Sequence, residues 1–238
     1  MDTPYVIEHR KRVDSTQDIA RSLAESSLGN ALVTADEQVA GRGRSGNSWW
    51  QADTNLFMSL AFWPVWSAQT WGRIPLIVGN AVADTIDELL GVNVGLKWPN
   101  DILIDDDKVG GILVEAKDGV VVAGCGINLS WANPPAGAAG IVVLTTAETR
   151  NRLATGIADR VLGVLAGDAD SWPLTRYKAR CVTLGEQVTW QGGGPAEAVD
   201  VLTTGELLVR VTGGDMPLVA SEVRHVRAAT LSRDDSEH

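Results

Sequence analysis

One short loop gathers the residues best suited to binding a charged ligand. Residues 41–46 read GRGRSG, and Trp49 and Trp50 follow shortly after. Glycine lets the backbone approach a ligand closely, and each arginine offers a forked, permanently charged donor for phosphate or carboxylate. The flat tryptophan faces could stack on a ring. The loop therefore predicts a lid over an anion joined to an aromatic group, such as a nucleotide; a solvated basic surface turn is the alternative.

We expect this loop to be disordered when the site is empty. Three glycines make it entropically costly to order. In the sequence, Glu37 and Asp53 lie only at its edges, so neither arginine has an acidic neighbour to hold it.

The glycine spacing matches the fingerprint of dinucleotide-binding loops, but the surroundings do not. That fingerprint opens a helix and expects an acidic residue about 20 positions further on. Residues 47–51 are a poor helix start, and no acidic residue occurs between Asp53 and Asp84. The sequence also lacks the lysine-containing phosphate loop of Walker-type nucleotide-binding proteins. Any use of ATP therefore requires a different architecture.

The composition restricts the class of protein. Of 238 residues, 45% are hydrophobic and 21% are charged, as in ordinary globular domains. The net charge of −10 argues against broad nucleic-acid binding. The first residues lack the basic start and apolar core of a signal peptide, and no run of about 18 apolar residues could span a membrane. We expect a cytoplasmic protein with one large domain, or a large and a small one.

Metal and nucleophile chemistry have little support. The two cysteines, Cys125 and Cys181, and the three histidines are not spaced as metal ligands, so we expect no structural metal. Cys125 lies in an apolar run and is interpreted as a small core residue. With so few histidines, a Ser-His-Asp or Cys-His site is disfavoured. The chemistry must come from lysine, arginine, aspartate, asparagine and backbone groups.

The segment before the loop predicts a strand, a helix and a second strand. Residues 6–13 have the pattern of a strand, and Ser15 can cap the helix that follows. Residues 31–35 form the next predicted strand, which leads through Gln38 into the loop. Ser15 and Thr16 either only cap the helix or present hydroxyls at its N-terminus to a small polar group.

Beyond the loop, helices and strands alternate, and polar residues lie at strand ends. Apolar residues that recur every three or four positions predict helices over 71–90 and 148–165. Apolar runs between polar turns predict a strand over 55–63 and a strand meander over 92–129. Sites are commonly built at such ends, and the polar residues there are Lys97, Asn100, Asp101, Lys108 and Asn128.

The pattern changes from Gly185. Short strand-like runs separated by glycine turns occupy residues 187–219, which predicts a small β-barrel of about 50 residues. We place the boundary near Val182. Residues 1–182 would form the large, ligand-binding domain, residues 183–232 the small domain, and residues 233–238 a disordered tail.

Five motifs occur in order along the chain: VDST at 13–16, Gln38 with GRGRSG at 41–46, KWPND at 97–101, KVGGILVE at 108–115 and GCGINL at 124–129. Together they resemble biotin protein ligases, which attach biotin to carboxylase subunits. The segment 198–224 resembles the C-terminal SH3-like domain of that family. Each motif alone is modest, but the ordered series covers nearly the whole chain.

The resemblance implies an α+β fold with a class II aminoacyl-tRNA synthetase-like catalytic domain, in which helices flank a mixed β-sheet, and a C-terminal SH3-like barrel. It also implies two half-reactions. Biotin and MgATP give biotinyl-5'-AMP, and a lysine of the biotin carboxyl carrier domain of acetyl-CoA, acyl-CoA or pyruvate carboxylase then takes the biotin. The twelve residues before Val13 cannot hold the DNA-binding domain that some members carry. We expect no DNA or membrane partner, and a homodimer stays open.

The resemblance also assigns roles to residues. For biotin it implies Ser15, Thr16, Gln17, Gln38, Arg42, Gly43, Arg44, Lys108, Gly111, Gly124 and Gly126. For ATP and the adenylate it implies Arg42, Arg44, Trp49, Lys97, Asn100, Asp101 and Asn128, with Mg²⁺ carried near Asp101 and Asn128. Lys108 and Arg44 are the implied catalytic cations, with Lys108 bridging the biotin carboxylate and a phosphate oxygen. Without the resemblance, Lys108 is interpreted as a solvated lysine after three aspartates.

One residue departs from the family pattern, and three alternatives remain. Gln17 stands where asparagine is expected; it keeps the amide but is one methylene longer. A lipoate or octanoate ligase of the same fold would lack the loop 41–46 together with the motif 97–101. A biotin-binding protein without catalysis would need no adenine platform. A nucleic-acid-binding SH3-like module would need a basic tail.

Overall fold

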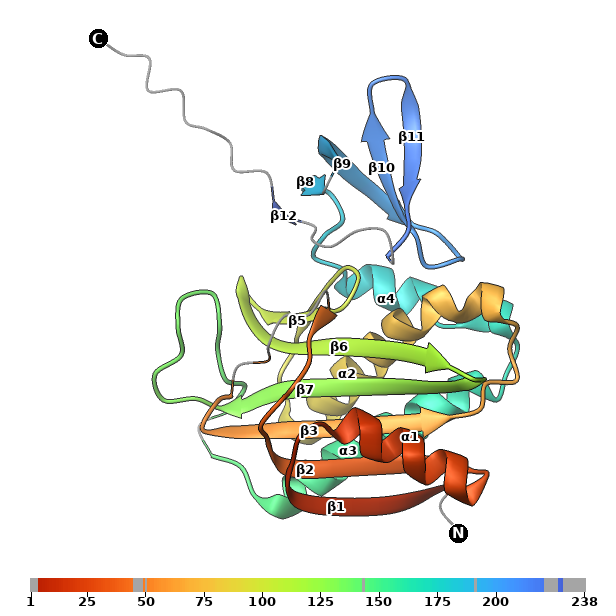
Figure 1. Cartoon of the computed structure of the whole chain (residues 1–238). Coiled ribbons are helices and arrows are strands. Elements are labelled where there is room, and N and C mark those ends of the chain that lie inside the picture. Colours follow the sequence, from red (N-terminus) through yellow and green to blue (C-terminus); the bar gives the residue numbers. More distant parts are fainter. Residues whose placement is uncertain are drawn as a thin grey trace.

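The computed structural model describes residues 4–44, 49, 51–142, 144–190, 192–220 and 227–228. Its main feature is a seven-stranded sheet with the strand order β1-β2-β3-β7-β6-β5-β4 (Figure 1). β1 and β2 are parallel and the other neighbouring strands are antiparallel, so the sheet is mixed. The strands are β1 Tyr5–Val13, β2 Asn30–Gln38, β3 Thr54–Phe62, β4 Gly95–Lys97, β5 Asp101–Ile104, β6 Asp107–Lys117 and β7 Val120–Ser130.

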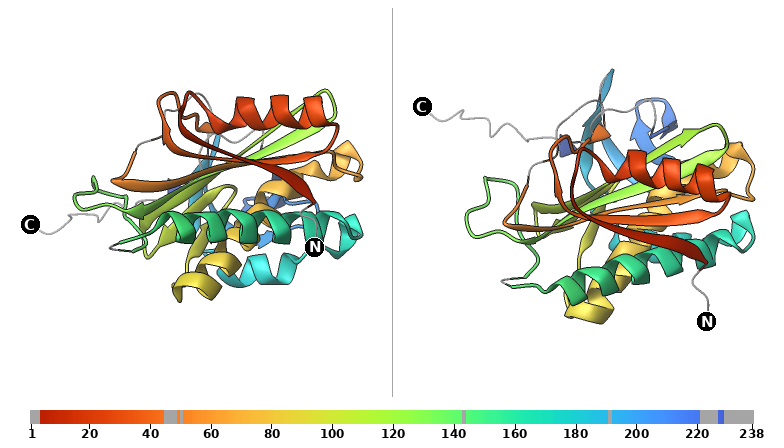
Figure 2. Two further views of the ribbon diagram at one scale, coloured as in Figure 1. Left: turned by 90° about the horizontal axis from the view of Figure 1, so that it is seen from below. Right: turned by 60° about the horizontal axis from the view of Figure 1, so that its bottom comes forward.

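Helices cover both faces of this sheet. α1 lies on one face, and α2 and α3 lie on the other (Figure 2). The helices are α1 Thr16–Ser27, α2 Ile74–Leu90, α3 Ala147–Leu165 and α4 Leu174–Arg180, with 3-10 turns at Ala68–Arg73 and Ala169–Ser171. None of the described helices combines the length and apolar character that crossing a membrane requires. The α+β class predicted from the sequence is confirmed.

Side-chain alternation along the strands separates two apolar cores. Met58 of β3 and Ile127 of β7 face the large core that α2 and α3 cover. On the opposite face, Ala24 of α1 packs over Val33 and Val122. Burying one such large side chain contributes about 1.5–3 kcal/mol, so both layers hold the sheet in place.

The structure refines the extent of the elements predicted beyond the loop. The helix expected from residue 71 begins at Ile74, because residues 68–73 form a 3-10 turn and Pro75 occupies the first turn of α2, where its missing N–H costs nothing. Within the strand meander expected over 92–129, β4 has only three residues and β7 is a single strand of 11 residues.

The C-terminal part forms a second, smaller sheet. Its order is β11-β10-β9-β8-β12, with every neighbouring pair antiparallel. The strands are β8 Gln187–Trp190, β9 Gly193–Val201, β10 Leu207–Val211, β11 Gly214–Leu218 and β12 Arg227–Ala228. Within the described ranges these strands do not close into the barrel that the sequence predicts.

Two tryptophans of the large part hold one turn of this small sheet. Trp98 Nε1 donates to Gly205 O at 3.0 Å, and Trp172 Nε1 donates to Thr203 O at 2.9 Å. Gly205 has φ +95°, and a Cβ atom added to it would lie 2.9 Å from Gly72 O. The turn is thus seated tightly against the segment before α2.

This contact predicts a large cost for Gly205→Ala. The left-handed φ costs a residue with a Cβ about 1–2 kcal/mol, and the overpacking against Gly72 adds about 1–3 kcal/mol. Gly213→Ala is the matched control, because Gly213 has φ +108° and no atom within 4 Å of the added Cβ. Urea unfolding should show a clearly greater loss of stability for Gly205→Ala; equal losses would mean that the turn is loosely seated.

Candidate active site

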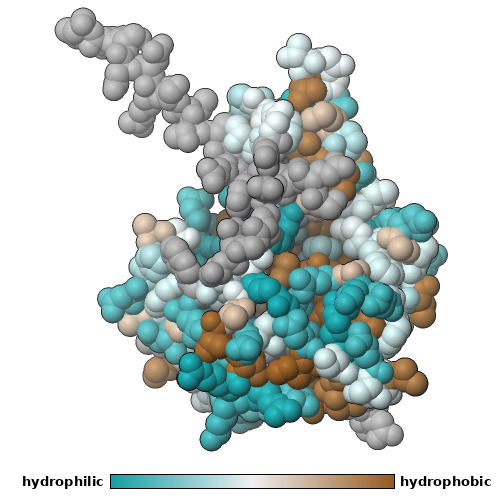
Figure 3. Space-filling view, viewed as in Figure 1, coloured by the Kyte–Doolittle hydropathy of each residue, from teal (hydrophilic) through white to brown (hydrophobic). Residues whose placement is uncertain are grey.

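The candidate site lies on the α1 face of the sheet, beside the N-terminus of that helix. Along β7, Val120 and Val122 pack under α1, and the next residues that face the same way are Gly124 and Gly126. β6 places Gly111 directly opposite Gly126. Because three neighbouring positions carry no side chain, a pocket opens above the strands. In Figure 3 this side of the molecule shows polar and apolar residues close together.

The indole of Trp49 lies over two of these glycines. A Cβ atom added to Gly126 would lie 2.7 Å from Trp49 Cε2, and one added to Gly111 would lie 2.8 Å from Trp49 Cζ3. Trp49 Nε1 is buried and has no hydrogen-bond partner within the described part of the chain. Even a methyl group at either glycine would therefore displace the indole.

The N-terminus of α1 forms one polar end of the pocket. Gln17 N–H donates to Ser15 Oγ at 3.3 Å, so Ser15 caps the helix. Gln38 Oε1 accepts from the N–H and the Oγ1 of Thr16, at 2.8 and 3.1 Å. Thr16 Oγ1 also lies 2.7 Å from Ser59 Oγ. Ser15 and Thr16 both line the pocket, so capping does not exclude ligand binding.

Gln17 spans from α1 to β6 and leaves one atom without a partner. Its Nε2 donates to Leu113 O at 3.2 Å. Because a carbonyl only accepts, the nitrogen must face Leu113, and the side-chain oxygen must point elsewhere. Gln17 Oε1 is buried without a partner among the described residues, and Gln17 lines the pocket over Gly124. The longer side chain thus offers a buried acceptor to a ligand.

Lys108 and Asp101 form an ion pair at the other end of the pocket. Lys108 Nζ lies 2.6 Å from Asp101 Oδ1 and 5.6 Å from the centroid of the Trp49 ring. The partner carboxylate, Asp101, lies on β5, which pairs with the strand β6 that carries Lys108. It is not one of the three aspartates that precede Lys108 in the sequence. The interpretation of Lys108 as a merely solvated lysine is therefore not supported.

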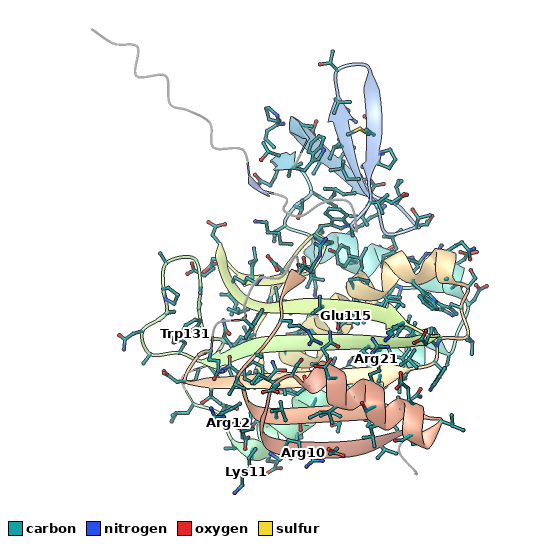
Figure 4. All side chains as sticks on the ribbon, viewed as in Figure 1. Arg10, Lys11, Arg12, Arg21, Glu115 and Trp131 are labelled. Carbon is teal, nitrogen blue, oxygen red and sulfur yellow. The ribbon has the colours of Figure 1, made fainter. Side chains whose placement is uncertain are left out.

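Arg42 is held by acidic residues that are distant in sequence. Its two terminal nitrogens donate to Asp18 Oδ2 and Oδ1 at 3.0 and 2.7 Å, and Glu115 Oε2 lies 3.5 Å from it. The hydrogen bond from Arg42 lowers the pKa of Asp18. Figure 4 shows Glu115 beside Arg21 of α1. The expectation that both loop arginines lack acidic partners is wrong for Arg42, because α1 and β6 bring carboxylates that the linear sequence separates from it.

Arg44 connects the loop both to the large, N-terminal part of the chain and to the C-terminal part that holds the small sheet. One terminal nitrogen donates to Asn100 Oδ1 at 3.1 Å, and the other donates to the backbone carbonyl of Ala220, which follows β11. Asn100 in turn donates through Nδ2 to Ile112 O at 3.2 Å. Burial lowers the pKa of Arg44, but a guanidinium remains charged at neutral pH.

Most residues predicted from the sequence meet in this pocket. Those that line it are Ser15, Thr16, Gln17, Gln38, Arg42, Gly43, Arg44, Trp49, Asn100, Asp101, Lys108, Gly111, Gly124 and Gly126. Lys97 and Asn128 are not among the lining residues. Lys97 lies on β4, the edge strand, where it is the register partner of Asp101 on β5. Asn128 is buried near the end of β7.

Some predictions fall on residues outside the described part of the chain. These are Ser45 and Gly46 of the loop, Trp50, and the tail 233–238. The expected disorder of the empty loop and of the tail therefore stays a prediction.

Five lining residues were not predicted: Met58, Ser59, Ile112, Leu113 and Cys125. Ser59 had a visible signal, since it is a hydroxyl within an otherwise apolar run of β3. The side chains of Met58, Ile112 and Cys125 belong to the core under α2 and α3, so their backbones account for their place in the lining. Cys125 is confirmed as a core residue, and burial raises its pKa to about 12.

Sequence comparison assigns the chain to a family. The model of the Biotin/lipoate A/B protein ligase family matches residues 10–131. The biotin–[acetyl-CoA-carboxylase] ligase of Mycobacterium tuberculosis is 31% identical over 227 residues, which cover 88% of this chain and 84% of the relative. The enzyme of the same name from Paracoccus denitrificans is 31% identical over 238 residues, with coverages of 89% and 97%. The chain belongs to the biotin/lipoate A/B protein ligase family.

Structural comparison agrees with that assignment. The biotin protein ligase from Aquifex aeolicus, solved in complex with biotin and ATP, has a TM-score of 0.78 and 24% identity, covering 94% of this chain and 99% of that structure. At this identity the likeness shows the fold alone. Taken with the nearly full-length relatives, it confirms the resemblance drawn from the five motifs: within its family the chain is a biotin protein ligase.

The Arg42–Asp18 pair predicts how a protease meets the loop. Asp18→Asn should speed trypsin cleavage after Arg42 severalfold, because the arginine loses its bidentate partner and reaches the protease more easily. Asp14→Asn is the control, since Asp14 is also exposed but forms no such pair with the described residues. Cleavage rates followed by mass spectrometry test this. If Asp18→Asn is cut at the wild-type rate, the pair does not restrain the loop.

Proposed function

We propose that this chain activates biotin with MgATP to biotinyl-5'-AMP and then transfers biotin to a lysine of a biotin carboxyl carrier domain. The observation that carries the proposal is a single pocket with two unlike ends. One end is built of hydroxyl and amide groups, the other of cations, and three glycines form the floor between them. Biotin has the same layout, with a cyclic urea at one end and a carboxylate at the other.

The hydroxyl and amide end would hold the urea. Thr16 donates both its N–H and its hydroxyl proton to Gln38 Oε1, so the amide oxygen of Gln38 faces Thr16. Gln17 Oε1 supplies a buried acceptor that an N–H of the ligand can satisfy. Ser15 and Gln38 complete this end. A ligand without N–H donors would leave the acceptor unpaired at a cost of about 1–3 kcal/mol, which favours biotin over lipoate or octanoate.

The cationic end would carry the first half-reaction. A biotin carboxylate oxygen attacks the α-phosphorus of ATP, and the bond to pyrophosphate breaks. Lys108 would bridge carboxylate and phosphate, and Arg44 would stabilise the negative charge that develops. Arg42 and the Gly43 backbone would close over the acyl chain. Gly111, Gly124 and Gly126 give the chain room to lie on the strands.

The second half-reaction needs an amine and the exclusion of water. The acceptor lysine, as the free amine, attacks the acyl carbon of the adenylate, AMP leaves with the bonding electrons, and the nitrogen loses a proton. Water would hydrolyse the same mixed anhydride, so the loop 41–46 is proposed to cover it. The names of the relatives point to a carboxylase as the source of the acceptor domain.

The nucleotide would lie toward Asn100 and Asp101. Trp49 is proposed to pack on adenine, and Lys97 and Asn128 to stand behind these residues. No group of three or more His, Cys, Asp or Glu side chains that could hold a metal occurs in the described residues. Mg²⁺ held chiefly by phosphates needs only one or two protein oxygens. The proposed oxygens are those of Asp101, which lines the pocket, and Asn128 Oδ1, which has no partner among the described residues; the ion would neutralise phosphate charge.

Two finer assignments are also proposals. The large domain, residues 1–182, is class II synthetase-like and binds biotin and ATP. Residues 183–232 form an SH3-like domain, supported by the antiparallel order of β8 to β12. A cytoplasmic location stays a prediction from the sequence, and a homodimer stays open.

The defining experiment is transfer of biotin to a purified biotin carboxyl carrier domain with MgATP. We expect a mass increase of one biotinyl group on the acceptor, and release of AMP and pyrophosphate. Lipoate and octanoate, each offered with a matching lipoyl domain, should give no product. Biotin binding without pyrophosphate release would contradict the ligase proposal, and faster transfer of lipoate would favour the other branch of the family.

Lys108→Ala should impair adenylate formation. It removes a charge-assisted contact of about 1.5–3 kcal/mol, which slows the step about tenfold to a hundredfold. Stability should change little, because the Lys108–Asp101 pair is partly exposed. Pyrophosphate release without an acceptor measures the step. Lys117→Ala, an exposed lysine of the same strand, is the control; a wild-type rate in Lys108→Ala would exclude the role proposed for this lysine.

A further inference from the structure

The strand that carries Lys108 has a neighbour that is not part of β7. β6 pairs with β7 only as far as Gly110, so Lys108 lies beyond that pairing. Residues 137–139, here called the bracing segment, take the place of β7. Lys108 N–H donates to Gly137 O at 3.0 Å, and Ala139 N–H donates to Lys108 O at 3.1 Å. The backbone of Lys108 is thus held on this side by chain that follows it by about thirty residues in a loop.

That loop leaves β7 after Ser130, and Figure 4 shows Trp131 at its start, beside the end of the strand. The bracing segment contains small residues only, Gly-Ala-Ala. Ala139 packs at the edge of the large core, but Gly137 and Ala138 have little side chain to keep the segment in register. Hydrogen bonds must therefore help to hold it against Lys108.

A buried asparagine supplies that hold. Asn128 Nδ2 donates to Ala139 O at 3.2 Å and to Lys108 O at 3.5 Å, the longer of the two contacts. Asn128 O accepts from Ile141 N–H at 3.1 Å. Both side-chain partners are carbonyls, so the amide nitrogen must face them. The side chain is buried, and Asn128 does not line the pocket.

We infer that Asn128 is a positioning residue for Lys108. Its amide joins the carbonyls of the bracing segment and of Lys108, and so fixes the backbone from which the lysine side chain reaches Asp101 and the pocket. A lysine has four rotatable bonds, so its Nζ can be aimed only if the backbone is fixed. A displacement of about 1 Å at a catalytic group can cost about a hundredfold in rate. This inference rests on the proposed role of Lys108 in adenylate formation.

The inference differs from the nucleotide-side role given to Asn128 above, and one substitution separates them. Asn128→Asp keeps an oxygen where Oδ1 stands, so a metal or nucleotide contact would survive. It replaces the Nδ2 donor by a second oxygen, which faces the carbonyls of Ala139 and Lys108 and repels them. We therefore expect Asn128→Asp to lose the positioning of Lys108 and to keep any contact of the Oδ1 position with a metal or nucleotide.

The chain offers a matched control in Asn80. This asparagine is also buried, its Nδ2 donates to the carbonyl of Pro173 at 3.0 Å, and its Oδ1 also lacks a partner in the described chain. It lies on α2, and it does not line the pocket. Asn80→Asp therefore reproduces the loss of a buried amide donor without touching Lys108.

The first measurement is amide hydrogen exchange in the protein without ligands or Mg²⁺. Asn128→Asp should speed exchange of the Lys108 and Ala139 amides about tenfold or more relative to wild type. Asn80→Asp should leave these two amides unchanged. This readout does not depend on activity, so it stands even if the proposed function fails. Unchanged protection in Asn128→Asp would overturn the inference.

The second measurement is pyrophosphate release with biotin and MgATP. Asn128→Asp should lower kcat about tenfold or more with the KM for biotin within about threefold, because positioning acts on the reacting geometry rather than on the pocket. Wild-type kcat in Asn128→Asp together with a slow Asn128→Ala would assign the residue to the metal or nucleotide and overturn positioning. A wild-type enzyme that releases no pyrophosphate would instead reject the proposed function.

A second variant covers the case in which Asn128→Asp does not fold. Ala139→Pro removes the N–H that donates to Lys108 O and leaves Asn128 in place. It should show the same faster exchange at Lys108 and the same fall in kcat. Normal exchange and a normal rate in Ala139→Pro would show that the bracing segment does not position the lysine.

Discussion

The site depends on missing side chains at three neighbouring positions of one sheet face. Under α1 this face carries Val120 and Val122, and the helix packs on them. Two residues further along β7 the same face carries Gly124, then Gly126, with Gly111 opposite. The pleat forces any side chain at these positions up into the pocket, where it would meet Gln17 or Trp49. The ligand space is therefore a gap in the side-chain layer of an otherwise continuous sheet.

Carboxylates of the chain stand beside the cations that surround this gap. The chain is acidic overall, yet the pocket gathers Arg42, Arg44 and Lys108. Arg42 is paired with Asp18 and Lys108 with Asp101, while Arg44 donates to Asn100 and also interacts electrostatically with Asp101. These pairs are partly exposed, so water screens them and they are individually weak. An anionic ligand can exchange them at modest cost, and inside a closed, drier pocket it would gain more from each cation than the protein partner does.

Short stretches of the sequence predicted the local elements, and the family resemblance that five such stretches carry predicted most of the pocket. The cap at Ser15, the apolar periodicity of α2 and the glycines of β7 need only neighbouring residues to be recognised. What it could not show are contacts that cross the fold. The Arg42–Asp18 pair joins residues 24 apart, and the reasoning from neighbours alone left Arg42 without a partner. Ser59 and the bond of Asn128 to the bracing segment likewise depend on strand register, which no single stretch displays.

The motif 97–101 places a buried tryptophan, Trp98, among polar residues. Lys97 ends β4 and Asp101 begins β5, and the two are register partners, so the turn between them is very short. Trp98 is buried in this turn and donates to the small sheet at Gly205. Asn100, two residues later, lines the pocket and accepts from Arg44, which itself reaches Ala220 beyond β11. The small sheet thus contacts both the base of the turn and the arginine above it. Because so few bonds separate Trp98 from Asn100, a shift of the small sheet must move the end of the pocket where the nucleotide is proposed to lie.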